Sequence, residues 1–130
     1  MSGWTPQQLA ALAGDDELGI ASRRPDGTLR PFITIWFVTH GGDLYVRSAH
    51  GPENGWYRRA LASGTGRVRV RGLERDVTFN APDHGLDAAL HAAYESKYVR
   101  YARGIVRTVV SPEAAGATLR LDPADSPPGG

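Results

Sequence analysis

The stretch that most constrains the fold is PFITIWFVTHGGDLYVRS, which begins at Pro31. Its first part, 32–39, is rich in the β-branched and aromatic residues that favour strands, and 44–48 has a similar composition. Between them, 41–43 reads Gly-Gly-Asp, which is typical of a turn. The stretch therefore predicts an antiparallel β-hairpin, so the fold of this chain must contain a sheet.

The beginning of the chain carries a helix signal. Thr5 is a suitable N-cap, Pro6 occupies the first helical position, and Gln8 stands three residues after the cap. Trp4 is placed to pack on the first turn as a hydrophobic staple. These residues predict a helix over 6–13.

The other elements follow from periodicity and composition. RVRVR at 67–71 alternates strictly, as in a half-buried strand with one charged face. A stripe of large side chains recurs every three or four positions and predicts one long helix that Gly104 ends. The stripe consists of Leu86, Leu90, Tyr94, Tyr98 and Tyr101. The remaining expected segments are strands at 18–23, 76–80 and 117–121, a helix at 55–63 and a helical turn at 112–115.

Length and composition limit the class of protein. A chain of 130 residues fits one domain, expected over 1–121, and the Pro- and Gly-rich tail 122–130 is expected to be disordered. No window has the ~18 consecutive apolar residues of a membrane span, and the start lacks an export signal, so we expect a cytoplasmic protein without a membrane partner. The absence of cysteine excludes disulfides, thiolate metal sites and a cysteine nucleophile.

Charge and motifs narrow the chemistry further. The net charge of +1 gives no general attraction to nucleic acid, although Arg67, Arg69 and Arg71 would lie on one strand face. No nucleic-acid motif accompanies them, which favours a solvent-exposed face and no nucleic-acid partner. His84 and His91 stand seven positions apart and no other histidine pair has ligand spacing, so no metal site is expected. Walker, Gly-x-Gly-x-x-Gly and Gly-x-Ser-x-Gly motifs are absent.

The segment VRSAHGPENGWYRRALASG, which follows the hairpin, favours anion binding. It leaves a strand at Ser48, turns at Gly51, and enters a helix with Arg58 and Arg59 near its start. Unpaired N–H groups at a helix N-terminus attract anions, and planar guanidinium groups suit phosphate or carboxylate. Arg47 stands just upstream. The alternative is that the aromatic pair of this helix fills the core and that its arginines are solvated.

The order of these segments resembles a known group of proteins. RPFITIWFVTHGGDLYVRS, then Gly51-Pro52, then WYRRAL and an alternating strand, is similar to the split β-barrel proteins of the flavin- and deazaflavin-binding, nitroreductase-like group. With AAYESKY and ATLRL added, the chain from about 20 to 121 resembles an uncharacterised, mainly actinobacterial family of unknown function. The resemblance implies an α+β fold: a mostly antiparallel, FMN-binding-like split β-barrel with an N-terminal helix and a long helix after the barrel strands.

The resemblance also implies roles for individual residues. In the deazaflavin-binding relatives the segment after the hairpin holds the cofactor phosphate, and Ser48, Gly51, Trp56 and Tyr57 match that segment by position. Ala49 and Arg59 depart from it, since the relatives have lysine and asparagine there. The full set of implied cofactor-binding residues is Thr34, Trp36, Arg47, Ser48, Gly51, Trp56, Tyr57, Arg58 and Arg59.

The function implied is that of an oxidoreductase acting on a small organic substrate with a flavin (FMN) or deazaflavin. Subunits of that group pair across the barrel, and the apolar hairpin FITIWFV also favours a homodimer. Two alternatives keep the fold: a cofactor-free isomerase or cyclase that uses Tyr94, Lys97 and Tyr98 as catalytic acid–base groups, and a non-catalytic ligand-binding module. The tyrosines would equally serve to pack their helix on the barrel, and Lys97 to solvate its surface.

Overall fold

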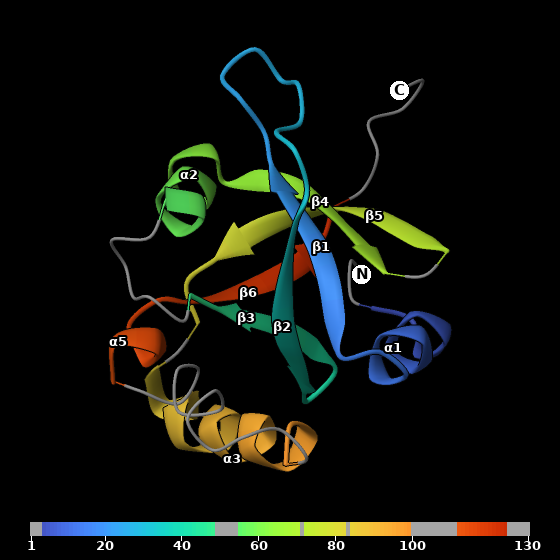
Figure 1. Cartoon of the computed structure of the whole chain (residues 1–130), viewed down its shortest axis with the longest axis vertical. Coiled ribbons are helices and arrows are strands. Elements are labelled where there is room, and N and C mark those ends of the chain that lie inside the picture. Colours follow the sequence, from blue (N-terminus) through green and yellow to red (C-terminus); the bar gives the residue numbers. More distant parts are fainter. Residues whose placement is uncertain (1–3, 49–54, 71, 83, 100–111, 125–130) are drawn as a thin grey trace.

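The structure, a computed structural model, describes residues 4–48, 55–70, 72–82, 84–99 and 112–124. Six antiparallel strands close into a barrel in the order β1-β2-β3-β6-β5-β4 (Figure 1). The strands are β1 Glu17–Ser22, β2 Ile33–His40, β3 Asp43–Arg47, β4 Thr65–Val70, β5 Leu73–Asn80 and β6 Thr118–Pro123. The helices are α1 Pro6–Ala13, α2 Gly55–Ser63, α3 Asp87–Lys97 and α5 Pro112–Ala115, with a 3₁₀ turn at His84–Leu86. The expected α+β split barrel is confirmed.

Alternation along the strands separates a packed barrel interior from an outer surface. Phe37 of β2, Val46 of β3, Val68 of β4 and Leu119 of β6 are fully buried inside. Gly66 lets two strands and a ring meet closely, because a Cβ there would lie 2.1 Å from the Ala21 carbonyl oxygen and 2.7 Å from the Phe79 ring. The interior is therefore filled by side chains, and a ligand must bind outside it or at its ends.

Helix α1 begins as its sequence predicts. The Thr5 side chain accepts a hydrogen bond from the Gln8 N–H at 3.1 Å, and the Gln8 side chain accepts one from the Thr5 N–H at 2.9 Å. Trp4 is buried, and its indole N–H donates to the Leu121 carbonyl at 2.9 Å. The capping box thus fixes the start of α1, while Trp4 attaches it to β6.

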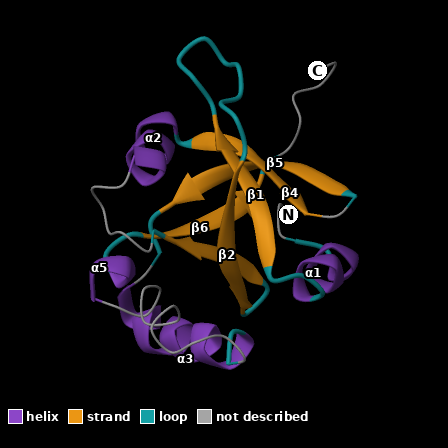
Figure 2. Ribbon diagram, viewed as in Figure 1, coloured by secondary structure: helices purple, strands orange, loops and turns teal. Residues whose placement is uncertain are grey.

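Helix α3 covers the outer side of β2 and β3 at one end of the barrel (Figure 2). Leu90, Tyr94 and Tyr98 are fully buried against Val38 and Tyr45. The helix ends at Lys97, earlier than the spacing predicts, because Tyr98 leaves helical geometry (φ −107°, ψ 24°) where its ring packs on β2. Tyr101 and Gly104 lie outside the described residues.

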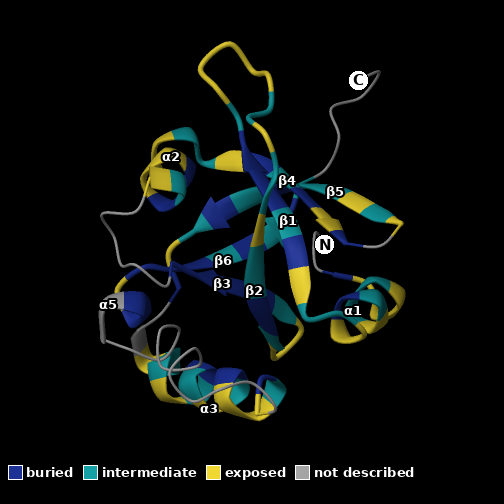
Figure 3. Ribbon diagram, viewed as in Figure 1, coloured by how far each residue is buried: buried dark blue, intermediate teal, exposed yellow. Residues whose placement is uncertain are grey.

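Helix α2 and the β1–β2 loop lie at the other end of the barrel, away from α3 (Figure 3). The loop carries the expected Pro-Asp-Gly turn and is closed by a bridge between Arg23 and Leu29. Most residues of the loop are exposed, whereas α2 buries Tyr57 and Ala60. A groove lies between α2 and the loop.

Candidate functional site

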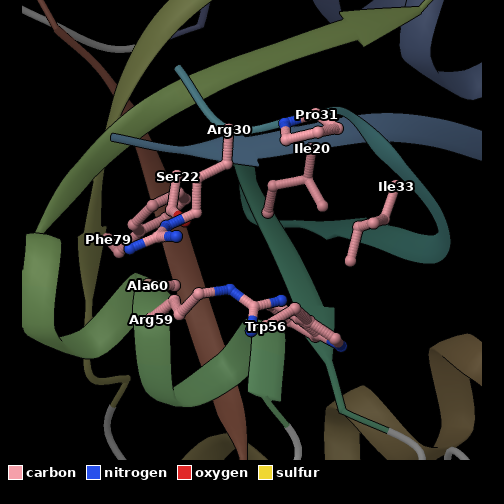
Figure 4. A pocket seen from close by; sticks show the side chains of 9 residues that line it. All are labelled: Ile20, Ser22, Arg30, Pro31, Ile33, Trp56, Arg59, Ala60 and Phe79. Carbon is pink, nitrogen blue, oxygen red and sulfur yellow. The ribbon is translucent and has the colours of Figure 1, made fainter. Parts of the chain in front are cut away.

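A pocket lies between α2, the end of the β1–β2 loop and the mouth of the barrel (Figure 4). Its lining combines two arginines with apolar side chains from strands and helix. The lining residues are Ile20, Ser22, Arg30, Pro31, Ile33, Trp56, Arg59, Ala60 and Phe79. Trp56 and Arg59 are two of the residues for which the resemblance implies cofactor binding, and the structure brings them together with Arg30 from a distant segment.

The backbone holds the two arginines on opposite sides of this pocket. Trp56 and Arg59 are three residues apart on α2, so both side chains lie on one face of the helix. The Arg59 guanidinium folds back over the first turn, where a Cβ added to Gly55 would lie 2.8 Å from Nη1. Arg30 comes from the loop, and its N–H donates to the Ser22 carbonyl at 2.9 Å. The glycine at 55 therefore allows a guanidinium to lie over the first described turn of α2.

The electrostatics of the pocket favour an anion. Within the part of the chain that the structure describes, the side chains of Arg30 and Arg59 make no hydrogen bond and no ion pair. The Nε of Arg30 is buried without an acceptor, and an unsatisfied buried donor costs about 1 to 3 kcal/mol. The cavity of about 20 Å³ has room for one water-sized group, such as one oxygen of a phosphate. An anion bound here would supply the missing acceptors.

Of the other residues expected at the phosphate, Tyr57 and Arg58 lie on α2, whereas Ser48 follows β3 beside Ala117. Ser48 is fully buried, its N–H donates to the Ala117 carbonyl at 3.0 Å, and its hydroxyl has no partner in the described structure. The Tyr57 hydroxyl lies 3.5 Å from the Gly116 carbonyl, and burial raises the pKa of Tyr57. Arg58 is exposed on α2. Gly51 lies outside the described residues.

Arg47 lies apart from this group. Its Nε donates to Thr118 Oγ1 at 2.9 Å, its Nη1 lies 3.0 Å from His91 Nδ1, and its guanidinium packs over the Tyr94 ring at 5.5 Å. Arg47 is buried, and burial lowers its pKa. The side chain therefore connects β3 to α3 and β6 on the outer side of the barrel, and it does not line the arginine pocket.

The two candidate cofactor-binding residues on β2, Thr34 and Trp36, differ in exposure to solvent. Thr34 is exposed on the outer face of the strand. Trp36, on the same face, stacks on Tyr98 with ring centroids 3.9 Å apart and planes 4° from parallel. One face of the Trp36 ring is thus covered by a side chain of this chain, whereas Thr34 is open to a ligand or a partner.

The three catalytic candidates lie together on and just after α3. The Tyr98 hydroxyl accepts from the Phe37 N–H at 3.0 Å and hydrogen-bonds the Asp16 carbonyl. The Tyr94 hydroxyl is buried without a partner in the described part of the chain, and burial raises its pKa. Lys97 Nζ donates to the Phe37 carbonyl at 2.8 Å and lies over the Phe37 ring. These groups join α3 to β2 at the end of the barrel opposite the arginine pocket.

Lys97 gives a pH-dependent prediction. Burial lowers its pKa from 10.5 to about 8, so the unfolded chain binds more protons than the folded one between those values. Stability conferred by the wild-type side chain should therefore rise as pH increases from about 8 to 10.5. We expect the difference in melting temperature between wild type and Lys97→Met to shift in favour of the wild type across this range. A difference that stays constant with pH would contradict this prediction.

Two of the three arginines of the alternating strand have protein partners. Arg67 Nε donates to Asp76 at 2.8 Å, and this hydrogen bond is the main reason that the pKa of Asp76 is lowered. The Arg69 guanidinium lies 4.1 Å from the centroid of the Phe32 ring. Arg71 lies outside the described residues. Two arginine side chains on this sheet face thus already contact other residues of the chain.

Within 4–48, 55–70, 72–82, 84–99 and 112–124, no helix has the length and apolar character needed to cross a membrane. The same ranges contain no group of three or more His, Asp or Glu side chains arranged to hold a metal ion.

Sequence reasoning missed Arg30. It lies near the end of the β1–β2 loop, eighteen positions before Ser48, and no spacing relates it to the phosphate segment. Its position depends on the barrel, which brings the loop beside α2. The available signal was weak: an arginine directly before Pro31 at the entrance to the hairpin strand.

Comparisons with known proteins agree with this architecture. The family model described as "Uncharacterized protein conserved in bacteria (DUF2255)" matches residues 8–121. No curated protein matches the sequence.

Several solved structures have a similar fold. A haem-storage protein from Vibrio cholerae has a TM-score of 0.64 at 10% identity, with 93% of this chain and 91% of that chain covered. An F420 reductase has a TM-score of 0.54 at 17% identity, covering 84% and 86%. A FAD-binding protein from Mesorhizobium loti has a TM-score of 0.52 at 15% identity, covering 95% and 91%. At these identities the likeness establishes the split-barrel fold.

Proposed function

The chain belongs to this family of uncharacterised bacterial proteins, and on that premise we propose that it binds a flavin (FMN) or a deazaflavin by the cofactor phosphate. We further propose that it is a cytoplasmic oxidoreductase that acts on a small organic substrate. The neighbours of similar fold include proteins named for F420 and FAD, which supports a cofactor of this type. The ring of such a cofactor supplies hydride transfer, so the protein itself has to bind, orient and shield it.

One observation carries the proposal: Arg30 and Arg59, neither with a partner in the described structure, line one pocket beside Trp56. In the proposal, the two guanidinium groups bind the phosphate together with the N–H groups at the start of α2. We also propose that the hydroxyl of Ser48, which is buried without a partner in the described structure, contacts a polar group of the ligand. Gly51 and Arg58 belong to the same proposed phosphate segment.

The ring would lie outside the small cavity. A volume of about 20 Å³ excludes a fused ring system, so only one oxygen of the phosphate enters between the arginines. We propose that the ring lies along the exposed outer side of β2 at Thr34, with Trp56 at the phosphate end and Trp36 at the far end. Tyr57, which is buried under α2, would position the helix for this contact. Arg47 would hold β3 in place without touching the cofactor.

Trp56 provides the test of this proposal. Trp56→Phe should lower the affinity for flavin mononucleotide about tenfold and barely change the melting temperature of the free protein, because Trp56 is only partly buried. The matched control is Trp4→Phe, which replaces a buried indole by a smaller ring, removes its hydrogen bond to the Leu121 carbonyl, and should lower stability without changing affinity. Quenching of tryptophan fluorescence by the flavin would measure the binding. Equal loss of affinity in both variants would contradict the assignment.

A second candidate function rests on the other end of the barrel. Lys97 lines a groove with Ala13, Thr39, Ser96 and neighbouring side chains, and its lowered pKa of about 8 suits acid–base exchange near neutral pH. In this candidate, Tyr94, Lys97 and Tyr98 act on a small substrate without a cofactor. A screen of carbonyl substrates for isomerisation, with Lys97→Met as the control, would test it. Binding without any turnover would instead favour the non-catalytic module.

We also propose a homodimer. The outer face of β2 is covered by α3 near Val38 but is exposed at Thr34, so a partner subunit could cover the rest and complete a cofactor site. Light scattering at micromolar concentration should give the mass of two chains, and Thr34→Asp should reduce it towards one. A wild-type monomer under these conditions would contradict the proposal.

A further inference from the structure

Lys97 is the only lysine in a chain whose other permanently cationic side chains are all arginines. A guanidinium group stays protonated in proteins, so an arginine nitrogen does not act as a nucleophile. A lysine amine can lose its proton and then attack an electrophilic carbon. Position 97 therefore carries the one side-chain amine of this chain that can form a covalent bond with a ligand.

This amine lines a groove between the end of α1, strand β2 and helix α3. The groove has a volume of about 330 Å³, which is enough for a small organic molecule. Most of its lining is apolar and comes from Ala13, Phe37, Val38 and Ala93. The groove therefore suits a small, mainly apolar ligand.

The surroundings of Lys97 favour a neutral amine. Within the ranges that the structure describes, no carboxylate forms an ion pair with it. Burial lowers its pKa from 10.5 to about 8 and outweighs the charge of Asp15, which favours the protonated form. About half of these amines are neutral at pH 8, compared with less than about 1% for an ordinary lysine. The nitrogen is thus available as a nucleophile near neutral pH.

The geometry at Nζ leaves its lone pair available. Nζ donates to the Phe37 carbonyl at 2.8 Å and lies 3.3 Å from the centroid of the Phe37 ring. Both are contacts of N–H donors, so they hold the nitrogen in place without using the lone pair of the neutral amine. A fixed nitrogen loses little conformational freedom when it reacts, which favours attack on a bound electrophile.

Two hydroxyl groups complete the groove. Thr39 and Ser96 belong to its lining, and neither side chain makes a hydrogen bond with the described residues. A hydroxyl can donate to the oxygen of a carbonyl group, and this makes the carbonyl carbon more electrophilic. The groove thus combines a nucleophilic amine, hydroxyl donors and an apolar lining.

We propose that this groove binds a small, mainly apolar aldehyde and that Lys97 Nζ forms an imine with its carbonyl carbon. The neutral nitrogen attacks this carbon, a C–N bond forms, and the carbonyl oxygen takes up a proton. The oxygen then leaves as water, and both protons of that water come from the amine. The step needs no oxidant or reductant.

This inference goes beyond both candidate functions. The groove lies at the end of the barrel opposite the arginine pocket, so imine formation does not depend on the cofactor. In the cofactor-free candidate Lys97 only exchanges a proton, whereas here its nitrogen bonds to the ligand.

Reductive trapping of the full chain with butanal and cyanoborohydride tests the proposal. Cyanoborohydride reduces an imine to a stable amine, and mass spectrometry of peptides assigns the adduct to Lys97 or to the N-terminal amine. The comparison uses the variant Leu61→Lys, which adds an ordinary lysine at a position of α2 that is 51% exposed. At pH 8, Lys97 should be labelled about tenfold or more faster than the introduced lysine, because far more of its amines are neutral.

Ala13→Trp tests whether the groove takes part. Ala13 is exposed at the end of α1, so a larger side chain there should narrow the groove without disturbing the core. This variant should slow the labelling of Lys97 by butanal about tenfold. Labelling by formaldehyde, which is much smaller, should change little.

Two results would overturn the proposal. One is labelling of Lys97 by butanal no faster than that of the lysine introduced by Leu61→Lys. The other is an Ala13→Trp variant that slows butanal no more than formaldehyde. Neither result affects the cofactor proposal, because binding of flavin mononucleotide is measured separately.

Discussion

Gly66→Ala is expected to prevent stable folding. The added Cβ would lie 2.1 Å from the Ala21 carbonyl oxygen and 2.7 Å from the Phe79 ring, and the first of these is backbone of the paired strand β1. Relief requires β1 and β4 to separate where Ser22 pairs with Gly66. We expect a loss of more than about 3 kcal/mol, a large part of the stability of a small domain.

Gly72→Ala is the matched control. A Cβ at Gly72 would meet nothing within 4 Å, so this change should alter stability by less than about 1 kcal/mol. Thermal unfolding followed by circular dichroism compares the two variants. A Gly66→Ala protein that melts at the temperature of Gly72→Ala would show that the barrel does not close as described.

Arg59→Ala is expected to weaken binding of flavin mononucleotide by roughly tenfold to a hundredfold. A charge-assisted contact contributes about 1.5 to 3 kcal/mol, and Arg59 lies beside the N–H groups of α2. Arg30→Ala should have an effect of similar size, since its guanidinium lines the same pocket. The double variant should lose less than the sum of the two if both bind one phosphate.

Arg69→Ala is the control for a general electrostatic attraction between the positively charged protein surface and the cofactor phosphate. Arg69 lies over Phe32 on the outer face of the barrel and lines neither the arginine pocket nor the groove between α2 and the β1–β2 loop. Its removal should change affinity by less than about threefold at physiological salt, because exposed charges are screened. If Arg59→Ala and Arg69→Ala weaken binding equally, only the overall field matters and the phosphate assignment is wrong.

Local signals predicted much of the fold. The capping box at Thr5 and Gln8 placed α1 correctly, and the turn at 41–43 joined the two hairpin strands as expected. These features depend on neighbours in sequence, so the chain alone determines them. The end of α3 at Lys97 was predicted too late, because packing of Tyr98 on Trp36 decides it and periodicity does not.

The candidate site was predicted only in part. Trp56 and Arg59 share a helix, so spacing alone placed them together. The structure places the Arg47 guanidinium beside Thr118 and His91, residues distant in sequence, and no local pattern predicts this arrangement. The position of Arg30 beside α2 depends on closure of the barrel, which no local sequence pattern predicts.

Calorimetry of the unmodified protein with flavin mononucleotide and with the deazaflavin tests the central claim most directly. The account predicts saturable heat with at least one of them, a stoichiometry of one cofactor per chain, and competition by tripolyphosphate for the arginine pocket. An absorbance spectrum of the purified protein would show any cofactor that is retained. Absence of heat with both cofactors, with no quenching of tryptophan fluorescence, would contradict the claim that this barrel binds a flavin-type cofactor.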